Sequence, residues 1–182
     1  MIQKVRKGEE LDGVNIKSYL YKNQFISNTN SKLIVEQFSN GFSNLTYLLK
    51  IEKKELVLRC PPNGAVKYGH DMNREFKVLK GLNKGFEKAP KAYLFTNDVS
   101  IIGVPFYIME KIEGIILSRK EANNRDISAE EYQKIAYNWL DTFVELHDLD
   151  FKKIGLEDLG KPDGYVERQV KNWSKQYLRA AT

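Results

Sequence analysis

The amino-acid sequence predicts an α+β fold in which a lobe with a five-stranded antiparallel sheet and one helix precedes a helical region. Segments with the β-branched composition of strands come first, a helical apolar period interrupts them, and two long amphipathic segments close the chain. The 182 residues, 42% hydrophobic and 29% charged, can bury one core and the beginning of a second. We expect an N-terminal segment over residues 1–31, a sheet lobe over 32–113 and helices over 114–182.

Three strands are expected in the first half of the lobe. Residues 32–38 and 45–51 are rich in β-branched and aromatic side chains, and the turn at 39–44 between them contains an Asn-Gly pair. The two segments therefore form a hairpin. A third strand, 55–60, ends at a Pro-Pro pair because proline has no N–H to donate to a sheet ladder.

The apolar period changes after this strand. From Asp71 onward, apolar residues recur at spacings of four, three and three, which places them on one face of a helix that carries Glu75 and ends before Pro90. Strands at 92–95 and 104–109 complete the sheet. The helix is thus inserted after the third strand of the lobe.

The last third of the chain predicts two helices. Ser128 and Glu131 form a capping box at the start of the first, which runs to about residue 148. The second helix covers 165–180. Trp139 and Trp173 lie on the apolar faces of these helices, where we expect them to be part of a core.

Composition and charge argue against several functions. The net charge of +5 comes from lysines spread along the chain, so we expect no nucleic-acid partner. Cys60 is the only cysteine, and His70 and His147 are the only histidines, which leaves no metal site in the prediction. No apolar run approaches the roughly 20 residues of a membrane helix, and the N-terminus lacks a secretory apolar stretch. We expect a cytoplasmic protein.

The hairpin turn, the third strand and the first helix suggest a phosphate-binding site. Backbone amides of Gly41, Phe42, Ser43 and Asn44 can point into a concavity that accepts phosphate oxygens, although an Asn-Gly pair is also a common hairpin turn. Arg59 ends its strand and Glu75 lies sixteen positions later on the helix. Their pairing would hold the cation against a nucleotide's phosphates. The alternative is an ordinary surface salt bridge.

A connector follows the last strand. Met109, Glu110 and Ile112 lie where backbone groups can hydrogen-bond the edge of an adenine while apolar side chains pack on its ring, although a plain boundary between strand and linker explains the same residues. His147 and Asp148 resemble a catalytic His-Asp pair, but no asparagine follows at the spacing that a kinase catalytic loop requires. We assign His147 to a helix terminus and find no partner for His70 in the sequence.

Together these segments carry a joint resemblance to a known family. The segments are 35–47, 56–59, 61–62, 74–76, 103–110 and 155–160. They resemble the aminoglycoside and choline kinase-like phosphotransferase family, and within it the kinase-like domains of acyl-CoA dehydrogenase fusion proteins. The likeness covers about residues 32–182, and it implies a protein-kinase-like N-lobe followed by the first helices of an incomplete C-lobe.

The resemblance also implies roles for residues. Residues 41–44 would cover a triphosphate, Arg59 would stand where most relatives have lysine, Glu75 would be its helix partner, and the backbones of Glu110 and Ile112 would receive adenine. The intact enzyme would use ATP or GTP with Mg²⁺ and a small-molecule hydroxyl acceptor. The residues do not select between ATP and GTP. The resemblance permits antibiotics, choline-like alcohols, sugars or an acyl-linked hydroxy compound as the acceptor, and the residues do not select among these either.

The family's catalytic loop, His-Gly-Asp followed by asparagine, and its later metal-binding aspartate do not occur in this sequence. We therefore assign no catalytic and no metal-binding residue, and we expect the N-terminal part of a phosphotransferase that is inactive alone, whether a truncated chain, a degraded protein or half of a split gene. The alternative is a non-catalytic nucleotide-binding or protein-interaction module. In either case the apolar helix faces predict a homodimer or swapped oligomer.

Overall fold

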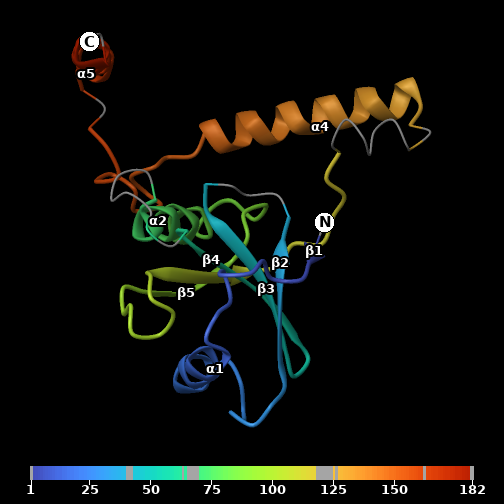
Figure 1. The fold of residues 1–182 in the computed structure, drawn as a ribbon. Coiled ribbons are helices and arrows are strands. Elements are labelled where there is room, and N and C mark those ends of the chain that lie inside the picture. Colours follow the sequence, from blue (N-terminus) through green and yellow to red (C-terminus); the bar gives the residue numbers. More distant parts are fainter. Residues whose placement is uncertain are drawn as a thin grey trace.

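The computed structural model describes residues 2–39, 43–62, 64, 70–117, 125, 127–161 and 163–180. One antiparallel sheet forms the centre of the lobe, with strand order β1-β2-β3-β4-β6-β5 (Figure 1). The strands are β1 Ile2–Gln3, β2 Leu33–Phe38, β3 Leu45–Ile51, β4 Lys54–Cys60, β5 Ala92–Thr96 and β6 Phe106–Glu110. The helices are α1 Gly13–Lys22, α2 Met72–Leu82, α4 Ala129–His147 and α5 Tyr165–Ala180.

The sheet confirms the five predicted strands and adds a sixth. In β1, Ile2 pairs with Phe38 and Gln3 with Gln37. A two-residue strand is too short to show an alternating pattern, which is why the sequence did not reveal it. The last strand begins at Phe106, two residues later than predicted. Pro105, directly before it, has no N–H to donate to the ladder.

The N-terminal segment contributes to the core of the lobe. Asp12 caps α1 by accepting hydrogen bonds from the backbone N–H groups of Val14 and Asn15. On the buried face of this helix, Ile16 and Leu20 pack against one face of the sheet. The core cluster there also contains Ile26, Leu45, Tyr47, Leu49, Ile51, Leu56, Leu58, Cys60, Phe106 and Ile108. The proposed boundary at residue 31 stays a prediction, but residues on both sides of it share this core.

Helix α2 packs beside β5 and β6. Asp71 caps its N-terminus by accepting from Arg74 N at 3.0 Å. Phe76 stacks on Phe95 of β5 with ring centroids 5.6 Å apart. This packing fixes the rotation of the helix about its axis, and therefore the direction in which Glu75 points.

The segment after α4 supports the other end of α2. Leu156 packs so closely on Gly81 that a Cβ added there would lie 2.7 Å from the leucine side chain. Glycine is therefore required for this contact despite its cost within a helix. Lys77 of α2 also forms an ion pair with Asp158. The 155–160 segment that carried part of the family resemblance is thus a support for α2.

The two C-terminal helices have the predicted bounds but leave their apolar faces open. Ser128 Oγ accepts from Glu131 N at 3.2 Å and Glu131 Oε2 accepts from Ser128 N at 2.9 Å, which confirms the capping box. Trp139 and Trp173 are 67% and 66% exposed, so the expectation that they are core residues was wrong. Their helical period is correct, but nothing in the described chain covers these faces. No described helix is both long and apolar enough to span a bilayer.

Candidate functional site

The register of β3, β4 and β6 places two rows of side chains on the sheet face opposite the α1 core. The first row is Leu48, Val57 and Met109, and the second is Thr46, Arg59 and Tyr107. Successive residues of a strand point to opposite faces, so residues two apart, such as Val57 and Arg59, share one face. An apolar row therefore lies beside a polar row, and the apolar row ends at the strand that leads into the connector.

The structure brings Arg59 and Glu75 together as predicted. Arg59 Nε lies 2.9 Å from Glu75 Oε2, and about a third of each side chain is exposed. This nitrogen is buried and has no hydrogen-bond partner, so the contact is a close ion pair without hydrogen-bond geometry. A pair this exposed contributes only about 0–1 kcal/mol to stability. The ion pair is therefore important because it fixes the position of the Arg59 guanidinium.

Two further side chains hold the Glu75 carboxylate. Asn44 Nδ2 donates to Glu75 Oε1 at 2.8 Å, and the Tyr107 hydroxyl donates to Oε2 at 2.9 Å. Burial, followed by the nearby Glu75 carboxylate, raises the pKa of the Tyr107 hydroxyl well above its ordinary range. The hydroxyl therefore keeps its proton and remains a donor to Glu75.

His70 extends this network, contrary to the expectation that it has no partner. Its Nδ1 lies 2.7 Å from Asn44 Oδ1. Sequence reasoning missed His70 and Tyr107 for the same reason, since their partners become visible only when the sheet register and the packing of α2 are known. The one available signal was the position of His70 directly before the Asp71 cap of α2.

The hairpin turn is described only in part. Gly41 and Phe42 of the predicted phosphate-binding turn lie outside the described residues. Ser43 is exposed, whereas Asn44 is 4% exposed and directs its side chain to Glu75 and His70. The structure thus gives Asn44 a side-chain contact with the α2 region that the sequence did not suggest.

The connector is anchored to the sheet. The Glu110 N–H donates to Lys91 O at 2.9 Å, so any contact of the Glu110 backbone with a base depends on its carbonyl oxygen. Lys111 forms ion pairs with Glu55 of β4 and with Glu113. Ile112 lies beyond β6 and is 58% exposed. These contacts fix the connector beside the apolar row that ends at Met109.

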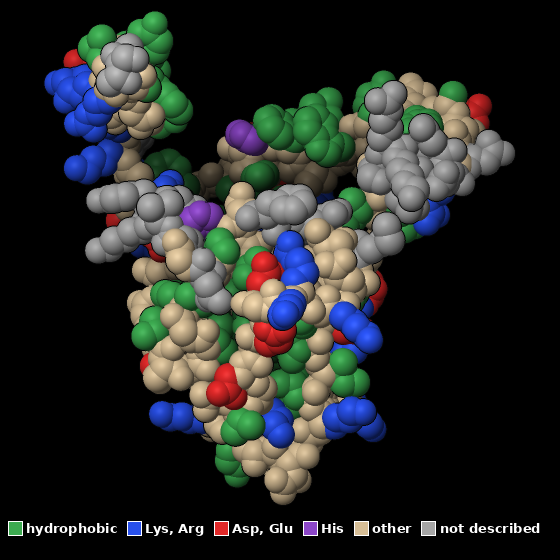
Figure 2. Space-filling view, in the orientation of Figure 1, with side chains coloured by type: hydrophobic (Ala, Val, Ile, Leu, Met, Phe, Trp, Pro, Cys, Tyr) green, Lys and Arg blue, Asp and Glu red, His purple; other side chains and the backbone are tan. Residues whose placement is uncertain are grey.

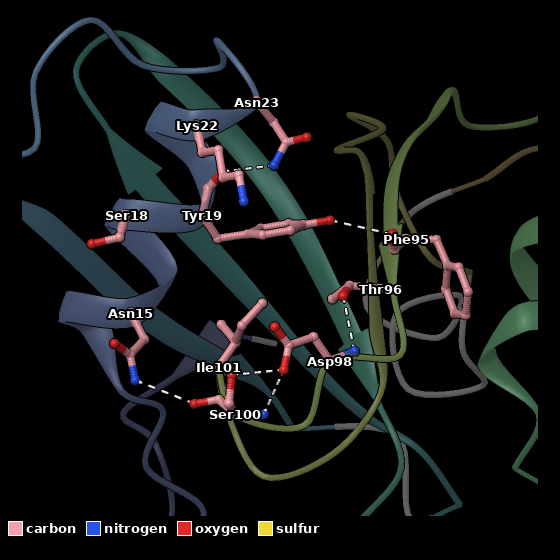
Figure 3. A pocket seen from close by; sticks show the side chains of 10 residues that line it. All are labelled: Asn15, Ser18, Tyr19, Lys22, Asn23, Phe95, Thr96, Asp98, Ser100 and Ile101. Atoms are coloured by element: carbon pink, nitrogen blue, oxygen red, sulfur yellow. Dashed lines mark hydrogen bonds between the residues drawn. The ribbon is translucent and has the colours of Figure 1, made fainter.

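Two hollows adjoin α2. One of about 330 Å³ lies between α2 and β6 and is lined by Glu75 and Tyr107. Another of about 460 Å³ lies beside His70 and the N-terminus of α2. A separate pocket of about 480 Å³ lies between α1 and the β5–β6 loop, where Tyr19 donates to Phe95 O at 3.3 Å (Figure 3). The described residues that line this third pocket include none of the predicted site residues.

The described residues do not form a metal site by themselves. They contain no group of three or more His, Cys, Asp or Glu side chains placed to hold an ion. The Mg²⁺ that the family resemblance implies therefore finds no ready ligand set in this part of the chain, and we assign it no residue.

An antiparallel sheet with a cation on one strand, a glutamate partner on the inserted helix and a connector after the last strand is the arrangement of a kinase-like fold. The chain aligns with a crystal structure from Ralstonia eutropha, provisionally named an aminoglycoside phosphotransferase. The TM-score is 0.75 with 29% identity, over 95% of this chain and 49% of that one. The chain belongs to the phosphotransferase enzyme family, whose model matches residues 34–182.

Similar proteins include some that are several times longer than this chain. Acyl-CoA dehydrogenase family member 11 of Gallus gallus is 32% identical over 97% of this chain, and its human counterpart is 34% identical over 94%. A protein of Arabidopsis thaliana named as a probable acyl-CoA dehydrogenase, IBR3, is 32% identical over 84% of this chain. The chain spans 23%, 22% and 19% of the lengths of these three relatives.

Proposed function

We propose that this chain is the nucleotide-binding part of an enzyme that transfers the γ-phosphate of ATP or GTP to a hydroxyl group of a small molecule. Membership of the phosphotransferase family supports the reaction class. The observation that carries the proposal is the 2.9 Å ion pair between Arg59 and Glu75. It holds a cation at the end of β4, on the face that also carries the apolar row.

In this proposal different residues contact the phosphates, the face of the base and the edge of the base. Because Nε of Arg59 faces Glu75, the terminal nitrogens of its guanidinium are left to meet phosphate oxygens in a forked geometry. The face of the base packs on Leu48, Val57 and Met109, and its edge meets the Glu110 carbonyl and the Ile112 N–H. The amides of the turn at 41–44 cover the phosphates.

The same proposal makes the chain inactive by itself. Phosphoryl transfer depends on positioning and on neutralising charge with metal ions and an aspartate. The sequence has no His-Gly-Asp motif that could supply that aspartate. The chain would thus bind the nucleotide and leave the transfer step to residues that it does not contain. In the complete enzyme Mg²⁺ would neutralise charge on the phosphates.

Calorimetric titration with ATP and with GTP tests the proposal. Arg59→Ala should weaken binding about tenfold or more, because it removes charge-assisted hydrogen bonds. Lys50→Ala is the matched control, since Lys50 pairs with Glu36 on the same sheet face and is 37% exposed against 35% for Arg59. Binding to the control should stay within about twofold. Equal affinities of the two variants, or no binding by the unmodified chain, would refute the proposal.

One observation favours a second candidate function, an interaction module. Exposed apolar side chains cover one side of both C-terminal helices, and Figure 2 shows them in green on α5 opposite a blue basic side. Helix α4 carries four acidic residues and one lysine, whereas α5 carries four basic residues and one glutamate. The apolar faces and opposite charges suit α4 of one chain to α5 of a second copy.

A further inference from the structure

A chain of hydrogen bonds joins His70 to the Arg59–Glu75 pair through Asn44. Its direction follows from donor and acceptor chemistry. The Glu75 carboxylate, paired with Arg59, can only accept, so the Asn44 amide nitrogen faces it. The Asn44 carbonyl oxygen, which also only accepts, then faces His70. His70 must therefore carry a proton on Nδ1.

Asn44 connects two parts of the site that are distant in sequence. It is the residue before β3, at the end of the hairpin turn, and it is 4% exposed. A buried amide must have its hydrogen bonds satisfied within the protein, and here both partners lie on or next to α2. The end of the turn is thus tied to α2 through one side chain, whose orientation is set by His70.

We propose that His70 is a positioning residue of the site: its Nδ1–H sets the Asn44 amide, which in turn holds Glu75 and the end of the hairpin turn in place relative to Arg59. This inference rests on the proposed nucleotide-binding function. His70 touches no nucleotide in this account and acts only through Asn44. Its removal leaves the Asn44 carbonyl buried without its donor, and the amide is then free to turn away from Glu75.

A general structural role for His70 is separable from this one. Helix α2 has its own cap, because Asp71 accepts from Arg74 N at 3.0 Å independently of His70. Two further anchors of the helix, the Phe76–Phe95 stack and the Lys77–Asp158 ion pair, do not involve the histidine. Replacing His70 should therefore alter the site without unfolding α2.

Two conservative variants provide the test. In His70→Asn the amide nitrogen can take the place of Nδ1, whereas in His70→Gln it can take the place of Nε2. Calorimetry with ATP should give an affinity within about twofold of the unmodified chain for His70→Asn. For His70→Gln and His70→Ala it should be weaker by about fivefold or more. Thermal melting of all three variants reports on folding. Equal losses in the Asn and Ala variants, or no loss in the Ala variant, would overturn the inference.

A measurement without nucleotide separates this inference from the function on which it rests. Two-bond ¹H–¹⁵N correlation spectra of the imidazoles at pH 8 should show His70 protonated at Nδ1 and unprotonated at Nε2. The signals of His147 are identified because they disappear in His147→Gln. The opposite tautomer would overturn the inference while leaving the proposed function intact. If His70 shows the expected tautomer but the chain binds no nucleotide, the hydrogen-bond network is confirmed. In that case both the proposed function and the positioning role are refuted.

Discussion

At the scale of single residues, the site depends on how one carboxylate is surrounded. Glu75 meets a guanidinium from β4, a hydroxyl from β6 and an amide from the end of the hairpin turn. The ion pair alone is worth about 0–1 kcal/mol in its partly exposed position, whereas the two hydrogen bonds come from the buried side chains of Asn44 and Tyr107. Together they leave the carboxylate one orientation. The network therefore fixes the position of the carboxylate that pairs with Arg59.

Cys60 should make the stability of the protein fall in alkaline solution. Burial, and after it the charge of Glu9, raises the pKa of this thiol from 9.0 to about 12. Above pH 9 the unfolded chain loses a proton that the folded chain keeps, so the free energy of unfolding decreases between pH 9 and 12, by at most about 1.4 kcal/mol per pH unit. Urea unfolding at intervals from pH 8 to 10 measures this slope.

The variant Cys60→Ala is the control for this effect. It should be less stable at pH 8 because it leaves a small cavity, but its stability should decline less between pH 8.5 and 10. Tyr47 and Tyr107 also have raised pKa values, but their unfolded-state value is 10.0, so they contribute chiefly at higher pH. Parallel slopes for the variant and the unmodified chain would show that Cys60 does not cause the decline.

At the scale of elements, α1 is part of the sheet lobe. Leu20 is fully buried in the core beneath the sheet, whereas Val14 on the same helix is 69% exposed. Leu20→Ala should therefore cost about 2–5 kcal/mol of unfolding free energy, and Val14→Ala no more than about 0.5 kcal/mol. Urea unfolding of both variants checks the difference. Similar small losses would mean that α1 is not docked on the sheet.

The elements also show which features a sequence can predict. The capping box of Ser128 and Glu131 and the period of α2 are local, so composition and spacing reveal them. The Arg59–Glu75 pair was predicted from the order of elements. The contacts of His70 and Tyr107 depend on the register of three strands and the rotation of α2, which no local pattern encodes. Trp139 is exposed because no described element packs on the apolar face of α4. The spacing of apolar residues shows that a helix has such a face but cannot show whether another element covers it.

At the scale of the whole molecule, the sheet lobe and the C-terminal helices differ in how well they are packed. The lobe buries a continuous core between α1 and the sheet. No residue of α4 or α5 is buried. Large exposed apolar patches mark interaction surfaces in soluble proteins. The molecule therefore combines a packed sheet lobe with two helices whose apolar faces are exposed.

If α4 and α5 pair between two copies, the chain should form a reversible dimer. The weight-average mass should then rise with protein concentration, which sedimentation velocity can measure. Val170 of α5 is 62% exposed on the apolar face, and Val170→Asp should give a monomer because it buries a charge in the contact. Val99→Asp, at a 53% exposed valine in the β5–β6 loop, should leave the dimer intact. Added salt should weaken it, since the two helices carry opposite charges. A chain that stays monomeric at every concentration, or equal behaviour of the two variants, would reject this pairing.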